Sequence, residues 1–168
     1  MTSTAPLPTL RDELAALHAP AFAWAVRCCR ENHGDAEDVL QQAYLTVLEG
    51  RARFEGRSSF KTWLFGVIRQ TARAQARRRW LRLALLESWW LGRPAESTDD
   101  RDAHEEIDQL RRALPRLSRR QQEVLHLVFY QDLTIQEAAD VLGMPVGTAR
   151  THYERGKQRL RQLLETQE

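Results

Sequence analysis

Residues 133–148 read Leu133-Thr-Ile-Gln-Glu-Ala-Ala-Asp-Val-Leu-Gly-Met-Pro-Val-Gly-Thr148. Thr134 and Glu137 have the spacing of a capping box, in which each side chain accepts a hydrogen bond from the other residue's backbone N–H at the start of a helix. Gly143 suits the left-handed conformation that ends a helix, while Pro145 cannot continue that helix but can begin another. The segment therefore predicts a short helix, a tight turn and the start of a second helix.

Two helices joined in this way have the sequence form of a helix-turn-helix. Ala139 is small enough for the helices to cross closely, Gly143 makes the turn, and Ala149 is the apolar residue that anchors the second helix. That helix extends to about Leu164, and the side chains pointing away from the anchor suit base edges and phosphates in a major groove: Arg150, Thr151, His152, Arg155 and Lys157. An amphipathic hairpin with a solvated charged face is the alternative, but it gives no reason for the Gly-Met-Pro turn.

The first half of the chain also has a helical pattern. Apolar residues recur at helical spacing, as in Val39, Ala43 and Val47, and no alternating pattern typical of strands competes with them. We expect three or four helices between about residues 9 and 80, with a break at Asn32-His33-Gly34. Ser58-Ser59 can cap a further helix that begins near Phe60.

The polar, acidic segment from Gly92 to Asp102 is typical of a linker. It divides the chain into two small helical domains, residues 1–85 and residues 109–168, joined by an acidic flexible linker at residues 86–108. In the second domain, Ser118 and Gln121 form another capping box, which opens a helix carrying Val124, Leu125, Leu127 and Val128. The predicted fold class is therefore all-α.

Charge is distributed unevenly along the chain. The formal net charge is only +2, but residues 51–86 contain ten basic residues and one acidic residue, and residues 87–108 contain two basic residues and eight acidic ones. In the basic segment Arg69, Arg73 and Arg77 recur every four residues and form one stripe of a helix, just after the aromatic residues Phe54, Phe60, Trp63 and Phe65. This combination suits binding of single-stranded nucleic acid, although a solvated arginine face fits equally well, and Trp63 and Phe65 individually favour core packing.

Several function classes find no support. Residues 1–10 lack the features of a signal peptide and no run of about 18 apolar residues could span a membrane, so we expect a cytoplasmic protein with no direct membrane insertion. A Gly-rich phosphate loop and a Ser/His/Asp arrangement are both missing, so we expect neither an enzyme nor a cofactor. The helix dipole explains the Asp35, Glu37 and Asp38 group better than a metal site does. Cys28 and Cys29 favour helix packing over a redox pair or a metal site.

A family resemblance connects these motifs. Asp35-Ala-Glu-Asp-Val-Leu-Gln-Gln-Ala-Tyr44, Phe54-Glu-Gly56 and Phe60-Lys-Thr-Trp-Leu64 resemble region 2 of the extracytoplasmic-function (ECF) sigma factors of the sigma-70 family. Leu117-Ser-Arg-Arg-Gln-Gln-Glu-Val-Leu125, the segment from Leu133 to Ala139 and the segment from Leu142 to Thr148 resemble region 4. The resemblance covers nearly the whole chain and implies a promoter-specificity subunit of bacterial RNA polymerase. A stand-alone helix-turn-helix transcriptional regulator is the alternative.

The resemblance also implies which residues bind which partner. The partners would be core RNA polymerase, through its beta and beta-prime subunits, promoter DNA and an anti-sigma factor. Contacts to core polymerase would be made by Asp38, Gln41, Gln42 and Tyr44. Recognition and melting of the minus-ten element would involve Phe54, Ser58, Ser59, Lys61, Trp63, Arg69, Gln70, Arg73, Arg77 and Arg78. Recognition of the minus-thirty-five element would involve Thr148, Arg150, Thr151, His152, Arg155 and Lys157.

Some positions depart from the family pattern. Gln70 stands where Asn is common, Ala149 replaces the usual Val, His152 stands where Arg is frequent, and an aromatic or other residue can occur at Glu154. The promoter preference therefore does not transfer from any relative. The apolar segment from Leu81 to Leu91, which includes Trp89 and Trp90, either extends the last helix of the first domain, which we favour, or presents a partner site.

Overall fold

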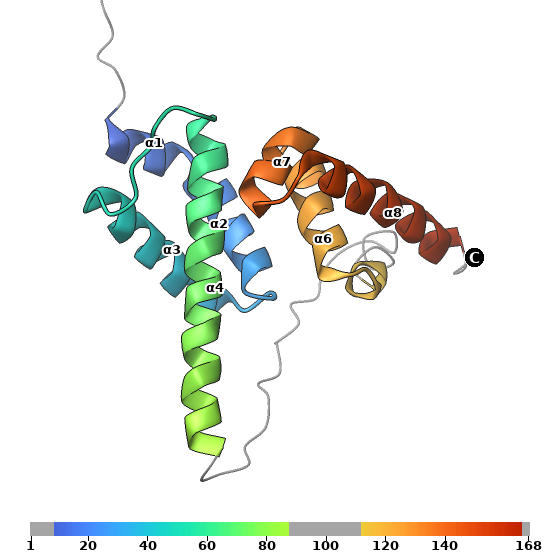
Figure 1. The fold of residues 1–168 in the computed structure, drawn as a ribbon, viewed down its shortest axis with the longest axis horizontal. Helices are drawn as coiled ribbons and strands as arrows, with labels where there is room; N and C mark the ends of the chain where they lie inside the picture. The colour runs from blue at the N-terminus through green and yellow to red at the C-terminus, as the bar shows by residue number, and fades with distance from the viewer. Residues whose placement is uncertain (1–8, 88–111, 166–168) are drawn as a thin grey trace, which may run out of the picture. The chain divides into compact units, whose positions relative to one another are not determined.

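The computed structural model describes residues 9–87 and 112–165, except for the side chains of residues 82–87. Within these ranges every regular element is a helix, which confirms the all-α prediction. The chain forms two compact units, Met1–Gln75 and Ala76–Glu168, and the division between them falls inside the long helix α4 (Figure 1). Most of the acidic linker at residues 86–108 lies outside the described residues, as do Trp89 and Trp90, so the domain boundaries stay a prediction.

The first unit is built on four helices, whose bounds are α1 Leu10–Ala16, α2 His18–Cys28, α3 His33–Leu48 and α4 Phe60–Glu87. Asn32 begins α3, because its side-chain oxygen accepts a hydrogen bond of 2.9 Å from the backbone N–H of Asp35. His33 and Gly34 therefore belong to the helix rather than to the break expected there. Ser59 caps α4 as expected, since its Oγ accepts a hydrogen bond of 3.1 Å from the backbone N–H of Thr62.

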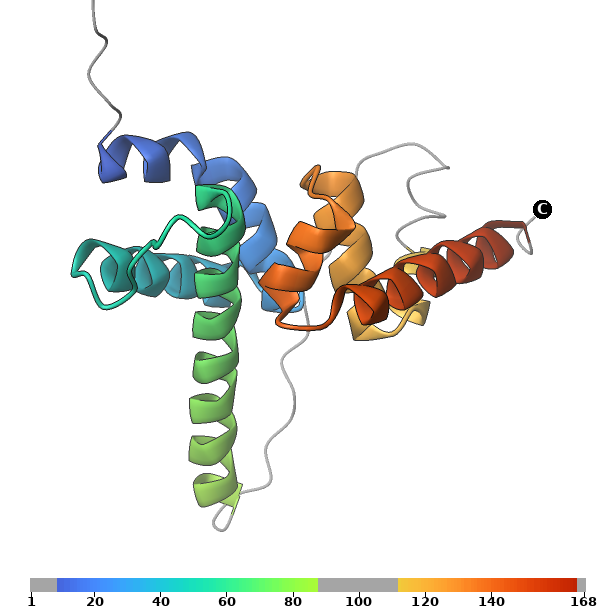
Figure 2. The ribbon, with the colours of Figure 1, turned by 45° about the horizontal axis from the view of Figure 1, so that its top comes forward.

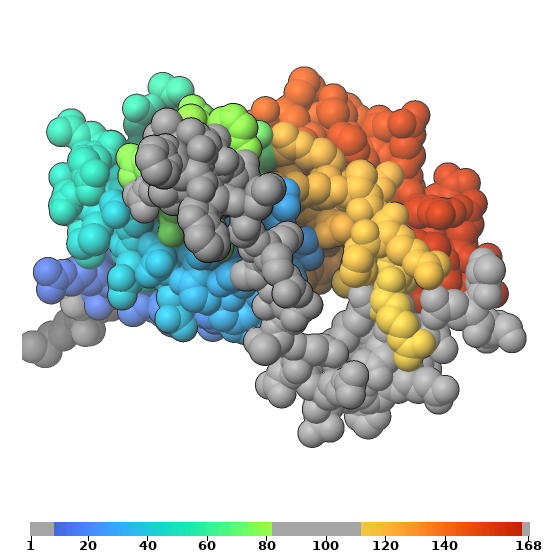
Figure 3. All heavy atoms as spheres, turned by 90° about the horizontal axis from the view of Figure 1, so that it is seen from below, coloured from blue at the N-terminus to red at the C-terminus, as the bar shows by residue number. Residues whose placement is uncertain are grey.

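Trp24 fixes α4 against α2 at the centre of the first unit. It is fully buried, and its Nε1 donates a hydrogen bond of 3.0 Å to the backbone carbonyl oxygen of Phe65. The two rings stack with their centroids 6.1 Å apart. Helices α2 and α3 form one continuous body in the space-filling view of Figure 3, and α4 projects beyond both of them in Figures 1 and 2. The core thus holds the first half of α4 and leaves its later turns to extend away from the other helices of this unit.

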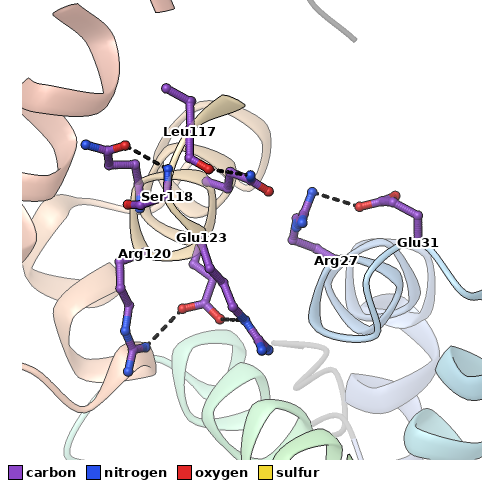
Figure 4. A network of polar contacts seen from close by, with 9 residues as sticks. Arg27, Glu31, Leu117, Ser118, Arg120 and Glu123 are labelled. Carbon is purple, nitrogen blue, oxygen red and sulfur yellow. Dashed lines mark hydrogen bonds and ion pairs between the residues drawn. The ribbon is translucent and has the colours of Figure 1, made fainter. Parts of the chain in front are cut away.

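The turn between α2 and α3 has an unusual backbone. Arg30 and Glu31 both adopt positive φ, at 56° and 64°, a region that L-residues with a side chain rarely occupy. Glu31 forms an ion pair of 2.8 Å with Arg27, four residues earlier (Figure 4). Cys28 is buried and Cys29 half-buried at the end of α2, as helix-packing residues would be.

The second unit consists of short helices around α8. The elements are η1 Leu114–Arg116, α6 Arg119–Leu125, η2 His126–Tyr130, α7 Ile135–Leu142 and α8 Val146–Glu165. Both predicted capping boxes are present, with Ser118 and Gln121 opening α6 and Thr134 and Glu137 opening α7. Helix α8 packs on both α6 and α7 (Figure 2).

The helix that begins at Ser118 does not continue unchanged through Val128 as expected. After Leu125 it widens into the π-helical turn η2, in which the backbone N–H of Gln131 donates a hydrogen bond of 3.1 Å to the carbonyl oxygen of His126. The turn leaves Phe129 and Tyr130 exposed, at 62% and 69%. Such π-turns often occur at functional sites, and this one contacts α8 through the rings of Phe129 and Tyr153.

A buried carboxylate lies on α6. The Glu123 side chain is 3% exposed, and its two oxygens are 3.2 Å from Arg119 Nε and 3.0 Å from Arg120 Nη1. Figure 4 shows Arg120 reaching this carboxylate. Burying a carboxylate is costly unless it is paired, so the two arginines make this position tolerable.

No helix in residues 9–87 and 112–165 is long and apolar enough to cross a bilayer. In the same ranges, no group of three or more His, Cys, Asp or Glu residues is arranged to hold a metal ion.

Candidate nucleic-acid interface

The turn between α7 and α8 has a defined hydrogen-bond pattern. Gly143 adopts φ 59° and ψ 47°, and its N–H donates a hydrogen bond of 3.2 Å to the carbonyl oxygen of Asp140. The N–H of Met144 donates one of 3.1 Å to the carbonyl oxygen of Ala139. These two bonds form the Schellman motif that ends a helix with a left-handed residue. Pro145 follows directly, and its carbonyl oxygen accepts the first helical bond of α8, from Ala149 at 3.1 Å.

Small residues set how closely α8 approaches its neighbours. Ala139 on α7 and Ala149 on α8 are both fully buried. Further along α8, Gly156 is buried against α6, and a Cβ built on it would lie 3.0 Å from Leu125 Cδ1 and 3.3 Å from Gln121 Cβ. The position of α8 therefore depends on having almost no side chain at three points of contact.

The opposite face of α8 is polar and mostly exposed. Of the residues expected at the minus-thirty-five element, Thr148, Arg150, Thr151 and Arg155 are exposed, whereas His152 and Lys157 are half-buried. Lys157 lies at the edge of this face, with its Nζ 3.4 Å from Glu154 Oε2 and 4.6 Å from the centre of the Tyr153 ring. The Tyr153 ring stacks in turn on Phe129 of η2, with centroids 5.6 Å apart. Sequence reasoning missed Phe129, because the widened turn that presents it has no sequence signal of its own.

An aromatic cluster lies where the loop before α4 meets that helix. The rings of Phe54, Phe60 and Trp63 have centroids 5.3 to 5.5 Å apart in all three pairs. Phe54 is 42% exposed, so the cluster has an open edge. Among the other residues expected here, Ser58 is half-buried, the Ser59 hydroxyl caps α4, and Lys61 Nζ lies 5.6 Å from the centre of the Phe65 ring.

The arginine stripe on α4 is not uniform. Arg73, Arg77 and Arg78 are exposed, as is Gln70, but Arg69 is only 6% exposed. Arg69 lies one turn after Phe65 and so sits at the edge of the buried face of the helix. The arginines spaced four residues apart therefore form an exposed stripe only from Arg73 onward.

The outward face of α3 carries the residues expected to contact core polymerase. Asp38, Gln41 and Gln42 are exposed, and Leu45 and Leu48, which the sequence analysis did not single out, are 49% and 46% exposed near them. The five positions fall on one side of the helix, opposite its buried residues Ala36, Val39, Leu40, Ala43 and Val47. The helical spacing of the sequence could have identified the two leucines. The apolar face of α3 is already complete without Leu45 and Leu48, so they must lie on its other side.

Tyr44 lies at the edge of this face. It is half-buried, and its hydroxyl is 3.4 Å from His18 Nδ1 on α2. Burial raises the pKa of the Tyr44 phenol, because the ionised form loses hydration there. This residue therefore connects α3 to α2 rather than standing free in solvent.

The second unit is thus a helix-turn-helix with an exposed, cationic second helix, the architecture of a DNA-binding protein. The family comparisons agree with this class. The model of sigma-70 region 2 matches residues 14–82, and the model of sigma-70 region 4 matches residues 107–160.

Known proteins of similar sequence are sigma factors. The ECF RNA polymerase sigma factor SigX of Bacillus subtilis (strain 168) is 31% identical over 147 residues, which span 80% of this chain and 73% of SigX. The ECF RNA polymerase sigma factor EcfG of Rhodopseudomonas palustris (strain TIE-1) is 28% identical over 156 residues, 93% of this chain and 85% of EcfG. The fold is similar to that of the sigma factor RpoE of Bartonella quintana, solved in complex with the anti-sigma factor NepR, with a TM-score of 0.71, 24% identity and coverage of 92% of this chain and 96% of RpoE.

The chain belongs to the ECF sigma factors, the two-domain RNA polymerase sigma factors of the sigma-70 family. It directs core RNA polymerase to promoters and initiates transcription. The comparisons thus favour a sigma factor over the alternative, a stand-alone transcriptional regulator.

Proposed function

We propose that α8 recognises the minus-thirty-five element of the promoter. The observation that carries this assignment is the exposed face of α8 beside a complete helix-turn-helix turn. Arg150 and Arg155 are exposed on that face, and arginine is the side chain that most often contacts guanine in the major groove. Thr148 and Thr151 supply shorter polar contacts. Lys157, at the edge of the face, suits a phosphate better than a base.

We infer that the minus-ten element binds at the junction of the loop and α4. The open edge of the Phe54, Phe60 and Trp63 cluster offers a surface on which an unpaired base can stack. Arg73, Arg77 and Arg78 follow along α4 and can neutralise phosphates of the same strand. Ser58, Ser59 and Lys61 lie at this junction, and further along α4 Gln70 is exposed while Arg69 is buried. These five residues belong to the same proposed site.

We propose that the outward face of α3 binds core polymerase. Asp38, Gln41 and Gln42 provide hydrogen-bonding groups, and Leu45 with Leu48 provides apolar area of the kind found at the centre of protein interfaces. A partner helix, such as one from the beta-prime subunit, could lay its own apolar residues along this face. Contacts to the beta subunit belong to the same proposal.

The proposal also covers how the protein is regulated, where in the cell it acts and whether it catalyses a reaction. RpoE of Bartonella quintana was solved with an anti-sigma factor, and we propose that this chain is likewise held inactive by one. It would act in the cytoplasm of a bacterium, where its polymerase is found. We propose that it catalyses no reaction, because binding energy alone can stabilise an unpaired strand; flipping out a base costs only about a few kcal/mol.

Run-off transcription tests the DNA surfaces. The full chain is mixed with purified core polymerase and genomic promoter fragments, and start sites are compared with those of core polymerase alone. The double variant Arg150→Ala, Arg155→Ala should lose promoter selection, whereas Arg116→Ala, an exposed arginine of the same unit outside α8, should retain it. Start-site selection no better than that of core alone would refute the function. Strong binding of promoter fragments without polymerase would favour a stand-alone regulator.

A binding assay tests the polymerase surface. Leu45→Asp should weaken binding of the full chain to core polymerase by tenfold or more, because it places a charge in the apolar part of the α3 face. Leu10→Asp, which changes a similarly exposed leucine on α1, is the matched control and should bind normally. Equal binding by both variants would show that α3 is not the contact surface.

A further inference from the structure

The centre of the exposed face of α8 is not occupied by its arginines. Ala149, Gly156 and Leu163 are the buried residues of this helix and define its inner side. At 100° per residue, the positions opposite them are Gly147, Thr151, Glu154 and Gln158, all of which are exposed. Arg150 and Arg155 lie on the two flanks of this central line. A carboxylate therefore stands in the middle of the surface proposed to enter the major groove.

The other members of the central line have less to offer a base. Gly147 has no side chain, and the Thr151 hydroxyl already donates a hydrogen bond of 2.9 Å to the carbonyl oxygen of Gly147. Within the line, Glu154 and Gln158 are the long polar side chains. Glu154 is nearer the start of the helix, which is the part of a recognition helix that meets base edges.

Contacts within the protein orient the Glu154 carboxylate. Its Oε2 is 3.4 Å from Lys157 Nζ, which lies 4.6 Å from the centre of the Tyr153 ring. Tyr153 stacks on Phe129 of η2, 5.6 Å away between centroids. This row of contacts limits the directions that the carboxylate can take while leaving it 60% exposed.

The chemistry of a carboxylate restricts what it can bind in DNA. An ionised carboxylate only accepts hydrogen bonds, and phosphates repel it. In the major groove, guanine and thymine present acceptor atoms, and adenine presents its N6 donor beside the N7 acceptor. Cytosine presents only the N4 amino donor, so it is the base that a carboxylate fits best.

We propose that Glu154 selects a cytosine in the minus-thirty-five element by accepting a hydrogen bond from its N4 amino group. This inference rests on the proposed role of α8 in binding that element. Glu154 acts as a specificity residue: with cytosine it gains a hydrogen bond, and with guanine or thymine it faces an acceptor.

A randomised promoter library tests the proposal. Full-length protein and core polymerase transcribe templates whose minus-thirty-five bases are randomised, and the transcribed templates are sequenced. The native protein should enrich cytosine at one position by about fivefold or more, the low end of the discrimination expected of a base contact. Glu154→Gln should lose this enrichment, because an amide both donates and accepts hydrogen bonds and therefore no longer discriminates against the acceptor atoms of guanine and thymine.

The matched control is Glu165→Gln. Residue 165 is exposed on the same side of α8, but eleven residues further on, or about 16 Å along the helix axis. The substitution Glu165→Gln removes one negative charge, as Glu154→Gln does, but it leaves the group near the proposed base in place. The cytosine preference should therefore persist. Circular dichroism establishes that both variants fold, and Glu154→Ala repeats the loss of the carboxylate in a different way.

The possible failures are distinguishable. Selection at the minus-thirty-five element without any position enriched in cytosine would overturn the inference alone, as would a cytosine preference that survives in Glu154→Gln and Glu154→Ala. Loss of the preference in Glu165→Gln as well would show a general charge effect and would also overturn it. No initiation above that of core polymerase would overturn the proposed role of the protein together with this inference.

Discussion

Gly156→Ala should reveal how closely α8 approaches α6. The added Cβ would lie 3.0 Å from Leu125 Cδ1 and 3.3 Å from both Leu125 Cγ and Gln121 Cβ. The leucine methyl group can rotate away, but Gln121 Cβ is fixed to the backbone of α6, so the two helices must separate by a few tenths of an ångström. Overpacking of this kind costs roughly 1 to 3 kcal/mol.

The gain in helix propensity opposes this cost. Replacing Gly by Ala inside a helix gains about 1 kcal/mol, so Gly156→Ala should lower the free energy of unfolding by about 0 to 2 kcal/mol. Gly147→Ala is the matched control, because it lies in the same helix with nothing within 4 Å of its added Cβ. It gains helix propensity without a clash, so it should raise the free energy of unfolding by about 1 kcal/mol. The difference between the two variants isolates the overpacking cost.

Circular dichroism of the full chain measures both variants. A cost of 1 kcal/mol lowers the melting temperature of a domain of this size by about 4 to 8 °C. Equal melting temperatures for Gly156→Ala and Gly147→Ala would show that α6 and α8 are not in the described contact.

Three further substitutions test individual contacts. Glu123→Gln should destabilise the second unit by about 1 to 3 kcal/mol, since it removes a charged partner from Arg119 and Arg120; an unchanged urea midpoint would contradict this. Thr134→Ala should cost about 0.5 to 2 kcal/mol, because it removes the cap of α7, and a thermal melt unaffected by it would show that the cap contributes nothing. For Tyr44, the folded pKa is raised above the ordinary value of 10.0, so its contribution to stability is complete below that pH and is lost as the pH rises through the folded pKa. Tyr44→Phe should therefore lose less stability than the native protein above about pH 10, and identical denaturation curves there would refute the assignment.

Helix starts were the part of the fold most accessible from the sequence. Thr134 with Glu137, and Ser118 with Gln121, each form a capping box as predicted, because both partners lie within three residues of each other. The turn at Gly143 could also be predicted, since a backbone with positive φ favours glycine. These features depend on residues only a few positions apart, so the sequence alone is enough to predict them.

Features that depend on distant packing were not accessible in the same way. The spacing of Arg69, Arg73 and Arg77 suggests one exposed stripe, but the burial of Arg69 depends on which face of α4 meets the core. The widening of the helix after Leu125 into η2 has no sequence marker. The break at Leu17 between α1 and α2 was not predicted either, as no glycine stands there and Pro20 lies inside the first turn of α2, where proline is tolerated.

In the candidate site, too, local features were predicted and features set by packing were not. Helix α8 and its exposed arginines were predicted from the motif, but the central place of Glu154 emerged only once Ala149, Gly156 and Leu163 had fixed the inner side of α8. Leu45 and Leu48 are a similar case on α3, because exposed leucines differ from buried ones only through the packing around them.

The hydrogen bond from Trp24 to the carbonyl oxygen of Phe65 closes the core of the first unit with residues that all precede Gln75. Helical units of this kind, which are rich in contacts between residues near in sequence, fold within about microseconds to milliseconds. Ribosomes add roughly 5 to 20 residues per second, so residues 88–168 take about 4 to 16 seconds to synthesise after α4 is complete. The first unit is therefore expected to fold, and to present its α3 surface, before helix α8 of the same chain has been made.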